Sequence, residues 1–188
     1  MTETTRKMTY SALMCALIIV STLWLKFPIP GTDVLFTTQV FFILLCGQLL
    51  PPRYCFFAIG AYLFLGLIGL PVFSATQGIA VILTPSFGYL LSFPFAAGAV
   101  SAVRNKLPSQ FIARIIASCI GIVVMYLIAL SYIAVLRGVY LAAPVPIGTL
   151  LASYCFAFLP LDIVKGVLAA LLSAKLEHPL RLIRKTKG

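Results

Sequence analysis

The feature that most constrains this chain is a long interval without any charged residue. Residues 54–103 contain no Asp, Glu, Lys, Arg or His. A membrane-spanning helix needs about 20 consecutive apolar residues, so this interval is long enough for two spans and a connection. The whole chain is 62% hydrophobic and only 10% charged, whereas soluble domains carry about 25% charged residues. The sequence therefore predicts an integral membrane protein.

The charged residues divide the chain into six apolar spans. We expect an all-α protein with six transmembrane helices in a single domain, residues 1–188, with short tails at about 1–8 and 177–188. A polar stretch at 71–85 separates the two spans of the charge-free interval. The other predicted spans are Ala12–Leu25, 34–52, 115–136 and 148–174.

The basic residues predict how these spans are oriented. If the N-terminus is cytoplasmic, that side collects eleven of the 14 Lys and Arg residues, and the opposite side only Lys26 and Arg137. The remaining one, Lys165, lies inside the last span. Cytoplasmic loops carry the excess of positive charge, so both termini are predicted to be cytoplasmic. The net charge of +10 is then expected to face anionic lipid, and no nucleic-acid partner is expected.

The outer connections under this topology are about 27–36, 71–85 and 138–148. They are rich in Pro, Gly, Ser and Thr. Two interpretations remain open: they are short turns whose composition stops the helices, or they form a lid over a site entered from outside.

One acidic residue stands apart from the others. The chain has four Asp and Glu residues, and only Asp162 lies well inside a predicted span, three residues before Lys165. Each charge near the bilayer centre costs about 2.5–3.5 kcal/mol on insertion scales, and a spacing of three places the two on one helical face. They either neutralise each other as a structural pair or bind a polar ligand with N–H donors and a carbonyl acceptor, such as a cyclic urea.

The surroundings of this pair favour a ligand site. Asp162 lies 13 residues from Lys175, about 20 Å along a helix, which places it in the outer half of the membrane. Pro160 either kinks a continuous helix or occupies the first turn of a shorter one, with Asp162 near its positive end. Phe158 shares the helical face of the pair.

Further polar side chains are candidates for the same site. Gln39, Ser86 and Tyr89 follow outer connections, so they could converge near Asp162. Tyr132 lies in the fifth predicted span. For each of these residues, a hydrogen bond between helices is the alternative to ligand contact.

The sequence gives no sign of catalytic or metal chemistry. The chain has one histidine and five separate cysteines without a C-x-x-C pair, so we expect neither an enzyme nor a metal site. No P-loop motif is present, so we expect any ATP hydrolysis to reside on other subunits.

Two small residues on the first span suggest close helix packing. Ala12 and Ala16 form a small-x-x-x-small step. Such steps allow helices to approach closely, either within the chain or against another membrane subunit.

Four runs of residues, taken in order, resemble one known family. The chain is similar to the BioY family, the biotin-specific substrate-binding subunits of energy-coupling-factor (ECF) transporters. The runs that carry the resemblance are Phe36–Phe42, Gly66–Phe73, Thr84–Leu90 and Asp162–Lys165.

The resemblance implies a non-enzymatic biotin-binding S-component in a prokaryotic plasma membrane, partnered by a membrane coupling subunit and two cytoplasmic ATPases. It implies that Asp162 and Lys165 contact the ureido ring of biotin, that Phe73 helps enclose the thioether ring, and that Ala12 and Ala16 face the coupling subunit. No cofactor is implied; biotin is the transported ligand. The alternatives are an S-component for thiamine or riboflavin, and a stand-alone secondary transporter that uses Asp162 as a proton carrier.

Overall fold

The structure is a computed structural model of the chain, and it describes residues 2–28, 34–107, 110–141 and 145–184, with side chains up to residue 176. The elements in chain order are α1 (Glu3–Trp24), β1 (Lys26–Pro28), β2 (Leu35–Thr37), α2 (Gln39–Leu49), α3 (Pro52–Leu67), the 3₁₀ helix η1 (Ile79–Leu83), α4 (Ser86–Lys106), α5 (Phe111–Val135), the π-helical turn η2 (Leu136–Tyr140), α6 (Ile147–Leu151), the π-helical turn η3 (Ala152–Phe156) and α7 (Leu159–Arg184).

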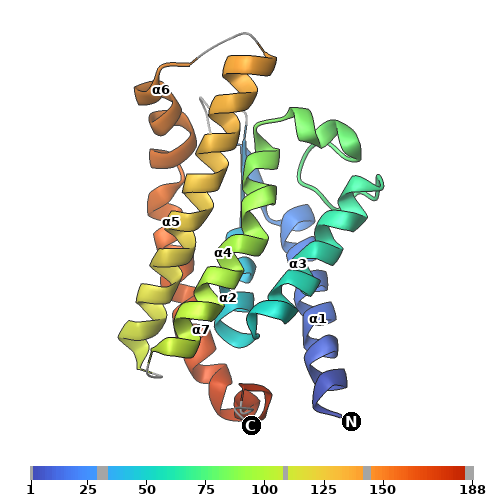
Figure 1. Cartoon of the computed structure of the whole chain (residues 1–188), viewed down its shortest axis with the longest axis vertical. Coiled ribbons are helices and arrows are strands. Elements are labelled where there is room, and N and C mark those ends of the chain that lie inside the picture. Colours follow the sequence, from blue (N-terminus) through green and yellow to red (C-terminus); the bar gives the residue numbers. More distant parts are fainter. Residues whose placement is uncertain (1, 29–33, 108–109, 142–144, 185–188) are drawn as a thin grey trace.

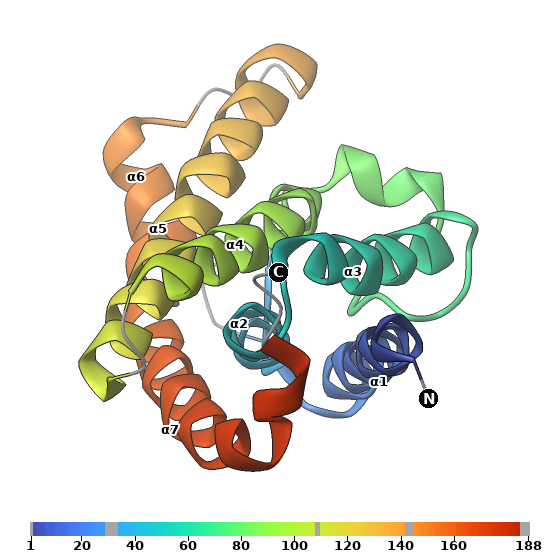
Figure 2. The same ribbon diagram turned by 60° about the horizontal axis from the view of Figure 1, so that its bottom comes forward.

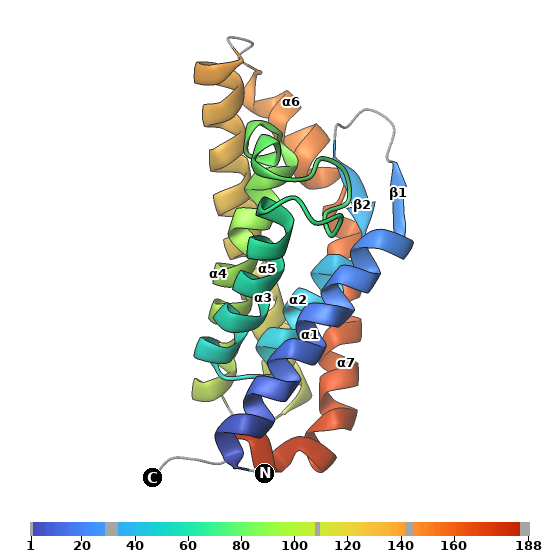
Figure 3. The ribbon, with the colours of Figure 1, turned by 90° about the vertical axis from the view of Figure 1, so that its right-hand side faces the viewer.

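The long helices form an elongated bundle with two distinct ends (Figure 1). Helix α1 begins and α7 ends at one end, whereas the β1–β2 hairpin and α6 lie at the opposite end (Figure 3). Helix α2 lies in the middle of the bundle and contacts α1, α3, α4, α5 and α7 (Figure 2). Because neighbouring helices surround α2, most of its side chains are buried, and apart from Gln39 and Gln48 they are apolar.

Four helical segments in the described residues are long and apolar enough to cross a membrane. They are Glu3–Trp24, Ser86–Lys106, Phe111–Tyr140 and Ile147–Leu176. The second predicted span, 34–52, contains a helix of only 11 residues, Gln39–Leu49, about 16 Å long at 1.5 Å per residue. The third contains Pro52–Leu67, with 16 residues. Within the described residues, four of the six predicted spans are therefore helices of full membrane-spanning length, and the other two contain shorter apolar helices.

The all-α prediction needs one correction. Strands β1 and β2 pair antiparallel within the first outer connection, with Phe27 opposite Phe36 and Lys26 opposite Thr37. The apolar run that begins at residue 34 therefore starts as a strand and becomes helical only at Gln39. Hydropathy alone cannot separate these states, because both bury apolar side chains.

Helices α4 and α5 pack closely because of a glycine. An added Cβ on Gly88 would lie 2.8 Å from the carbonyl oxygen of Ala129. Only glycine allows the two backbones to approach this closely. The contact fixes the start of α4, where Ser86 and Tyr89 lie, against the C-terminal half of α5.

The end of the bundle where α1 begins is tied together by buried polar side chains. The side chain of Gln48 donates to the carbonyl of Arg114 at 2.7 Å and to the hydroxyl of Ser118 at 3.0 Å. Arg114 in turn donates to Ser173 at 2.9 Å. These bonds join α2, α5 and α7, and buried bonds of this kind hold a bundle rigid.

Helix α7 begins with the proline that the sequence singled out. The structure has features of both predicted geometries: Ile147–Leu176 is one helical segment, but η3 ends at Phe156 and the regular helix α7 starts at Leu159 with Pro160 in its first turn. Proline fits there because the first backbone N–H groups of a helix have no intrahelical partner. Asp162 consequently lies in the first turn of α7, where the helix dipole favours negative charge.

Candidate functional site

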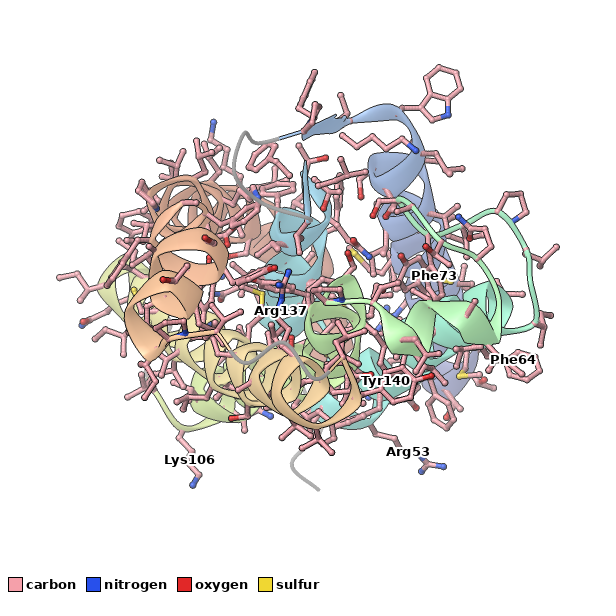
Figure 4. The ribbon with its side chains drawn as sticks, turned by 90° about the horizontal axis from the view of Figure 1, so that it is seen from above. Arg53, Phe64, Phe73, Lys106, Arg137 and Tyr140 are labelled. Atoms are coloured by element: carbon pink, nitrogen blue, oxygen red, sulfur yellow. The ribbon has the colours of Figure 1, made fainter. Side chains whose placement is uncertain are left out.

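A cavity of about 590 Å³, including its open mouth, lies at the hairpin end of the bundle. Its walls come from β2, the start of α2, the connection between α3 and α4, the start of α4 and the start of α7. Figure 4 looks onto this end of the molecule, with Phe73 labelled. Seven of the eight predicted site residues line the cavity: Gln39, Phe73, Ser86, Tyr89, Phe158, Asp162 and Lys165.

The charged pair is buried in the cavity wall. Asp162 is 3% exposed and Lys165 is 7% exposed. The ammonium of Lys165 lies 2.7 Å from Oδ1 of Asp162. Removing one partner from a buried pair leaves an uncompensated charge, so the two side chains depend on each other.

Lys165 also contacts the hairpin. Its ammonium donates to the carbonyl of Thr37 at 2.8 Å and lies 3.9 Å from the centroid of the Phe36 ring. Hydrogen bonds to the cation and the ring face both stabilise a charge removed from water. The pair therefore joins α7 to the strand that precedes α2.

The second oxygen of the carboxylate has a partner that the sequence analysis did not select. The hydroxyl of Tyr126, on α5, donates to Oδ2 of Asp162 at 2.6 Å. Tyr126 is buried and does not line the cavity. It approaches the carboxylate from the α5 side. In the sequence it is an uncharged residue within a largely apolar span, and nothing in its position indicated this contact.

Phe73 forms an aromatic wall that depends on a glycine. An added Cβ on Gly66 would lie 2.0 Å from Cζ of Phe73, so the ring occupies the space that any larger residue would fill. Phe73 also stacks edge-to-face on Tyr62, with ring centroids 5.3 Å apart. The amide of Gln77 bonds both the N–H and the carbonyl of Phe73. These contacts fix the ring before any ligand binds.

Gln39 places an unsatisfied donor at the cavity. The residue is 3% exposed, and its side-chain nitrogen has no hydrogen-bond partner in the described structure. A buried unpaired amide donor costs about 1–3 kcal/mol. An acceptor supplied by a ligand would remove this cost.

Tyr89, Phe158 and Ser86 complete the predicted wall. Tyr89 donates its hydroxyl to the carbonyl of Tyr154, and its ring lies 6.4 Å from the ring of Phe158. Ser86, at the start of α4, is half-buried. With the other lining residues they give the cavity a mostly apolar wall that includes aromatic rings and a few polar groups, which is typical of small-molecule sites.

Tyr132 is the predicted site residue that does not line the cavity. Its hydroxyl donates to the carbonyl of Ile82, and its ring packs edge-to-face on Phe87. Tyr126 and Tyr132 are six residues apart, a rotation of about 240° around the helix, so they cannot share a face. Tyr132 supports the connection before α4 rather than the cavity wall.

The cavity suits a small neutral ligand with donors and an acceptor on one edge. The carboxylate of Asp162 has lone pairs left to accept N–H bonds, and the ammonium of Lys165 can donate to a carbonyl; both bonds would be charge-assisted. Among the residues that the structure describes, no three His, Cys, Asp or Glu side chains gather in a way that could hold a metal.

Ala12 and Ala16 lie on the outer face of α1. Both are exposed, whereas the neighbouring Ser11, Met14 and Cys15 are buried against the bundle. The small-residue step is therefore not used for packing within the described part of the chain.

Comparison with known families gives one match over nearly the whole chain. The model of the BioY family matches residues 1–181.

Curated relatives agree with this match. A probable biotin transporter BioY of Lysinibacillus sphaericus is 34% identical over 140 residues, 74% of this chain and 70% of the relative. Another, of Pyrococcus horikoshii, is 35% identical over 142 residues, 75% of this chain and 79% of the relative. The biotin transporter BioY of Thermotoga maritima is 29% identical over 177 residues, 92% and 96% of the two chains.

A solved structure has the same fold. It is the crystal structure of the S-component for biotin from an ECF-type ABC transporter. The TM-score is 0.81, the sequence identity is 27%, and the match covers 95% of each chain.

Proposed function

The chain belongs to the BioY family, and we propose that it is the biotin-binding S-component of an ECF-type transporter. The curated relatives are biotin transporters or probable biotin transporters, and the solved structure is an S-component for biotin. A family of transporters implies a binding role rather than catalysis. The substrate is therefore expected to leave the site chemically unchanged.

The observation that carries the proposal is the buried pair on the cavity wall. Biotin has a cyclic urea, with two N–H donors and one carbonyl on the same ring. In the proposed complex Asp162 accepts from the N–H groups and Lys165 donates to the carbonyl oxygen. A ligand of this shape gives hydrogen bonds to both charged groups although its own ureido edge is neutral. A pair that served only to stabilise the fold would not need to line a cavity.

The remaining walls fit the rest of the ligand. Phe73 and Phe158 offer apolar surface for the thioether ring, and the unpaired nitrogen of Gln39 offers a donor to an acceptor atom of biotin. Ser86 and Tyr89 lie on the same wall. Burial of the ring against fixed aromatic side chains adds affinity, because little side-chain entropy is lost on binding.

The proposal includes the setting in which the protein works. We place the chain as six crossings of a prokaryotic plasma membrane, with the two short helices α2 and α3 completing the set and both termini cytoplasmic. Its partners are a membrane coupling subunit, which contacts the Ala12 and Ala16 face, and two ATPases that supply energy. The exposure of that face and the eleven-to-two division of basic residues support this arrangement.

The test is a thermal-unfolding panel with the purified full chain. Biotin should raise the unfolding temperature by several degrees at saturating concentration, because a ligand that binds only the native state stabilises it. Thiamine and riboflavin, which present a cation or a large tricyclic ring, should not. If thiamine or riboflavin raised the unfolding temperature and biotin did not, biotin would be the wrong substrate.

A further inference from the structure

The carboxylate of Asp162 is held from two directions. Lys165 donates to Oδ1 at 2.7 Å, and the hydroxyl of Tyr126 donates to Oδ2 at 2.6 Å. The terminal torsion of an aspartate is broad on its own. One donor on each oxygen removes this freedom, because rotation of the carboxylate would break both bonds.

Tyr126 is itself firmly placed. Its side chain is 5% exposed, and its ring packs edge-to-face on Tyr89 with centroids 6.1 Å apart. Tyr89 lines the cavity and is anchored by its hydroxyl on the carbonyl of Tyr154. The phenol of Tyr126 thus lies between a cavity-wall residue and the carboxylate, outside the ligand space.

We propose that Tyr126 is a positioning residue for ligand binding, which fixes the carboxylate of Asp162 so that its remaining lone pairs face the N–H groups of the ligand. This inference rests on the proposed function. Lys165 alone cannot set the orientation, since its ammonium is shared with the carbonyl of Thr37 and the ring of Phe36. Tyr126 adds a directed bond from a rigid group. Preorganised acceptors bind more tightly because the ligand need not order them.

The first test measures biotin affinity in a double-mutant cycle. Tyr126→Phe keeps the ring and removes only the hydroxyl, and it should raise the Kd for biotin by about 10- to 100-fold, the range expected for a hydrogen bond to a charged group. In the Asp162→Asn background the same change should have an effect of less than about threefold, because interacting residues are not additive. Tyr54→Phe, near the start of α3 and outside the cavity lining, is the control.

The second test reads the carboxylate directly and needs no ligand. The chain has four acidic residues, so the infrared carboxylate band of Asp162 can be assigned by its loss in Asp162→Asn. Tyr126→Phe should shift this band. A fluorotyrosine at position 126 keeps the ring and makes the hydroxyl a stronger donor, so it should shift the Asp162 band in the opposite direction. This variant replaces Tyr126→Phe in the test if Tyr126→Phe does not fold.

The outcomes separate the two proposals. If the wild-type protein does not bind biotin, the proposed function fails whatever Tyr126 does. If the wild-type protein binds biotin, Tyr126→Phe binds it equally well and the Asp162 band does not move, the positioning role of Tyr126 is overturned. The positioning role would also be overturned if Tyr126→Phe weakened biotin binding by the same factor in the wild-type and the Asp162→Asn backgrounds.

Discussion

At the scale of single residues, Asp162 and Lys165 could be found from the sequence because charge is rare in this chain. Their spacing on one helical face followed from helix geometry alone. Tyr126 could not be found this way, since an uncharged tyrosine in an apolar span has many possible neighbours. Only the rotation of α5 against α7 distinguishes it from Tyr132, and that rotation is set by packing between helices.

Gly166 shows the same limit. A glycine directly after Lys165 could be expected to leave open space beside the pair, but an added Cβ there would lie 3.2 Å from Ile122 and 3.4 Å from Ser118. The glycine therefore serves the contact between α7 and α5. Position on a helical face predicts neighbours only when the opposing helix is known.

A glycine substitution tests whether Phe73 must be fixed for binding. Gly66→Ala places a methyl group in the space of the Phe73 ring, and overpacking of this kind costs about 1–3 kcal/mol. We expect the Kd for biotin, measured by titration calorimetry, to rise at least about tenfold. The matched control is Gly60→Ala on the same helix, where an added Cβ meets nothing within 4 Å. Equal affinity in both variants would show that Phe73 does not need this position.

At the scale of elements, charge-free intervals located most of the helices. The start of α4 at Ser86 follows the predicted polar stretch 71–85, and α1 and α5 end within one residue of the predicted span ends. Both helices begin earlier than predicted, at Glu3 instead of Ala12 and at Phe111 instead of residue 115, so charged residues did not mark where they start. The hairpin and the shortness of α2 did not follow. Residues 34–52 carry no charge and are mostly apolar, and apolar content alone does not reveal where a strand gives way to a helix.

A hydrogen bond joins the two outer connections that border the cavity. The ammonium of Lys26, on β1, donates to the carbonyl of Ser74 at 2.9 Å. We predict that Lys26→Gln speeds biotin dissociation by about two- to tenfold, the effect of losing one modest hydrogen bond, as measured by release of labelled biotin. Lys106→Gln, at the other end of α4 from the cavity, should leave the rate unchanged. An unaltered rate in Lys26→Gln would mean that the link does not retain the ligand.

At the scale of the whole molecule, α1 begins and α7 ends at one end of the bundle (Figures 1 and 3). The cavity lies at the opposite end, where β2 and the starts of α2, α4 and α7 line it. The sequence predicted an even number of spans, and hence two ends on one side; that this side is cytoplasmic, from the distribution of Lys and Arg, stays a prediction. It could not decide whether Ala12 and Ala16 pack internally or face outward. Their exposure leaves the outward face available for a partner.

This face gives a prediction about assembly. The double substitution Ala12→Trp with Ala16→Trp adds bulk where small residues permit close helix approach. We expect it to abolish co-purification with the membrane coupling subunit while the Kd for biotin stays within about twofold, because the added rings point away from the core. Val123→Trp, on the exposed side of α5, is the control. Loss of biotin binding with retained assembly would contradict the assignment.

The central claim is that the buried pair binds the ureido ring of biotin, and calorimetric titration of Asp162→Asn with biotin tests it most directly. Glu3→Gln is the matched control, a half-buried acid at the other end of the bundle, where it pairs with Lys7 at 3.2 Å. The account predicts that Asp162→Asn weakens binding by at least about 30-fold, as expected for loss of charge-assisted bonds, while Glu3→Gln binds like the wild type. An Asp162→Asn variant that binds biotin as tightly as the wild type would contradict the account.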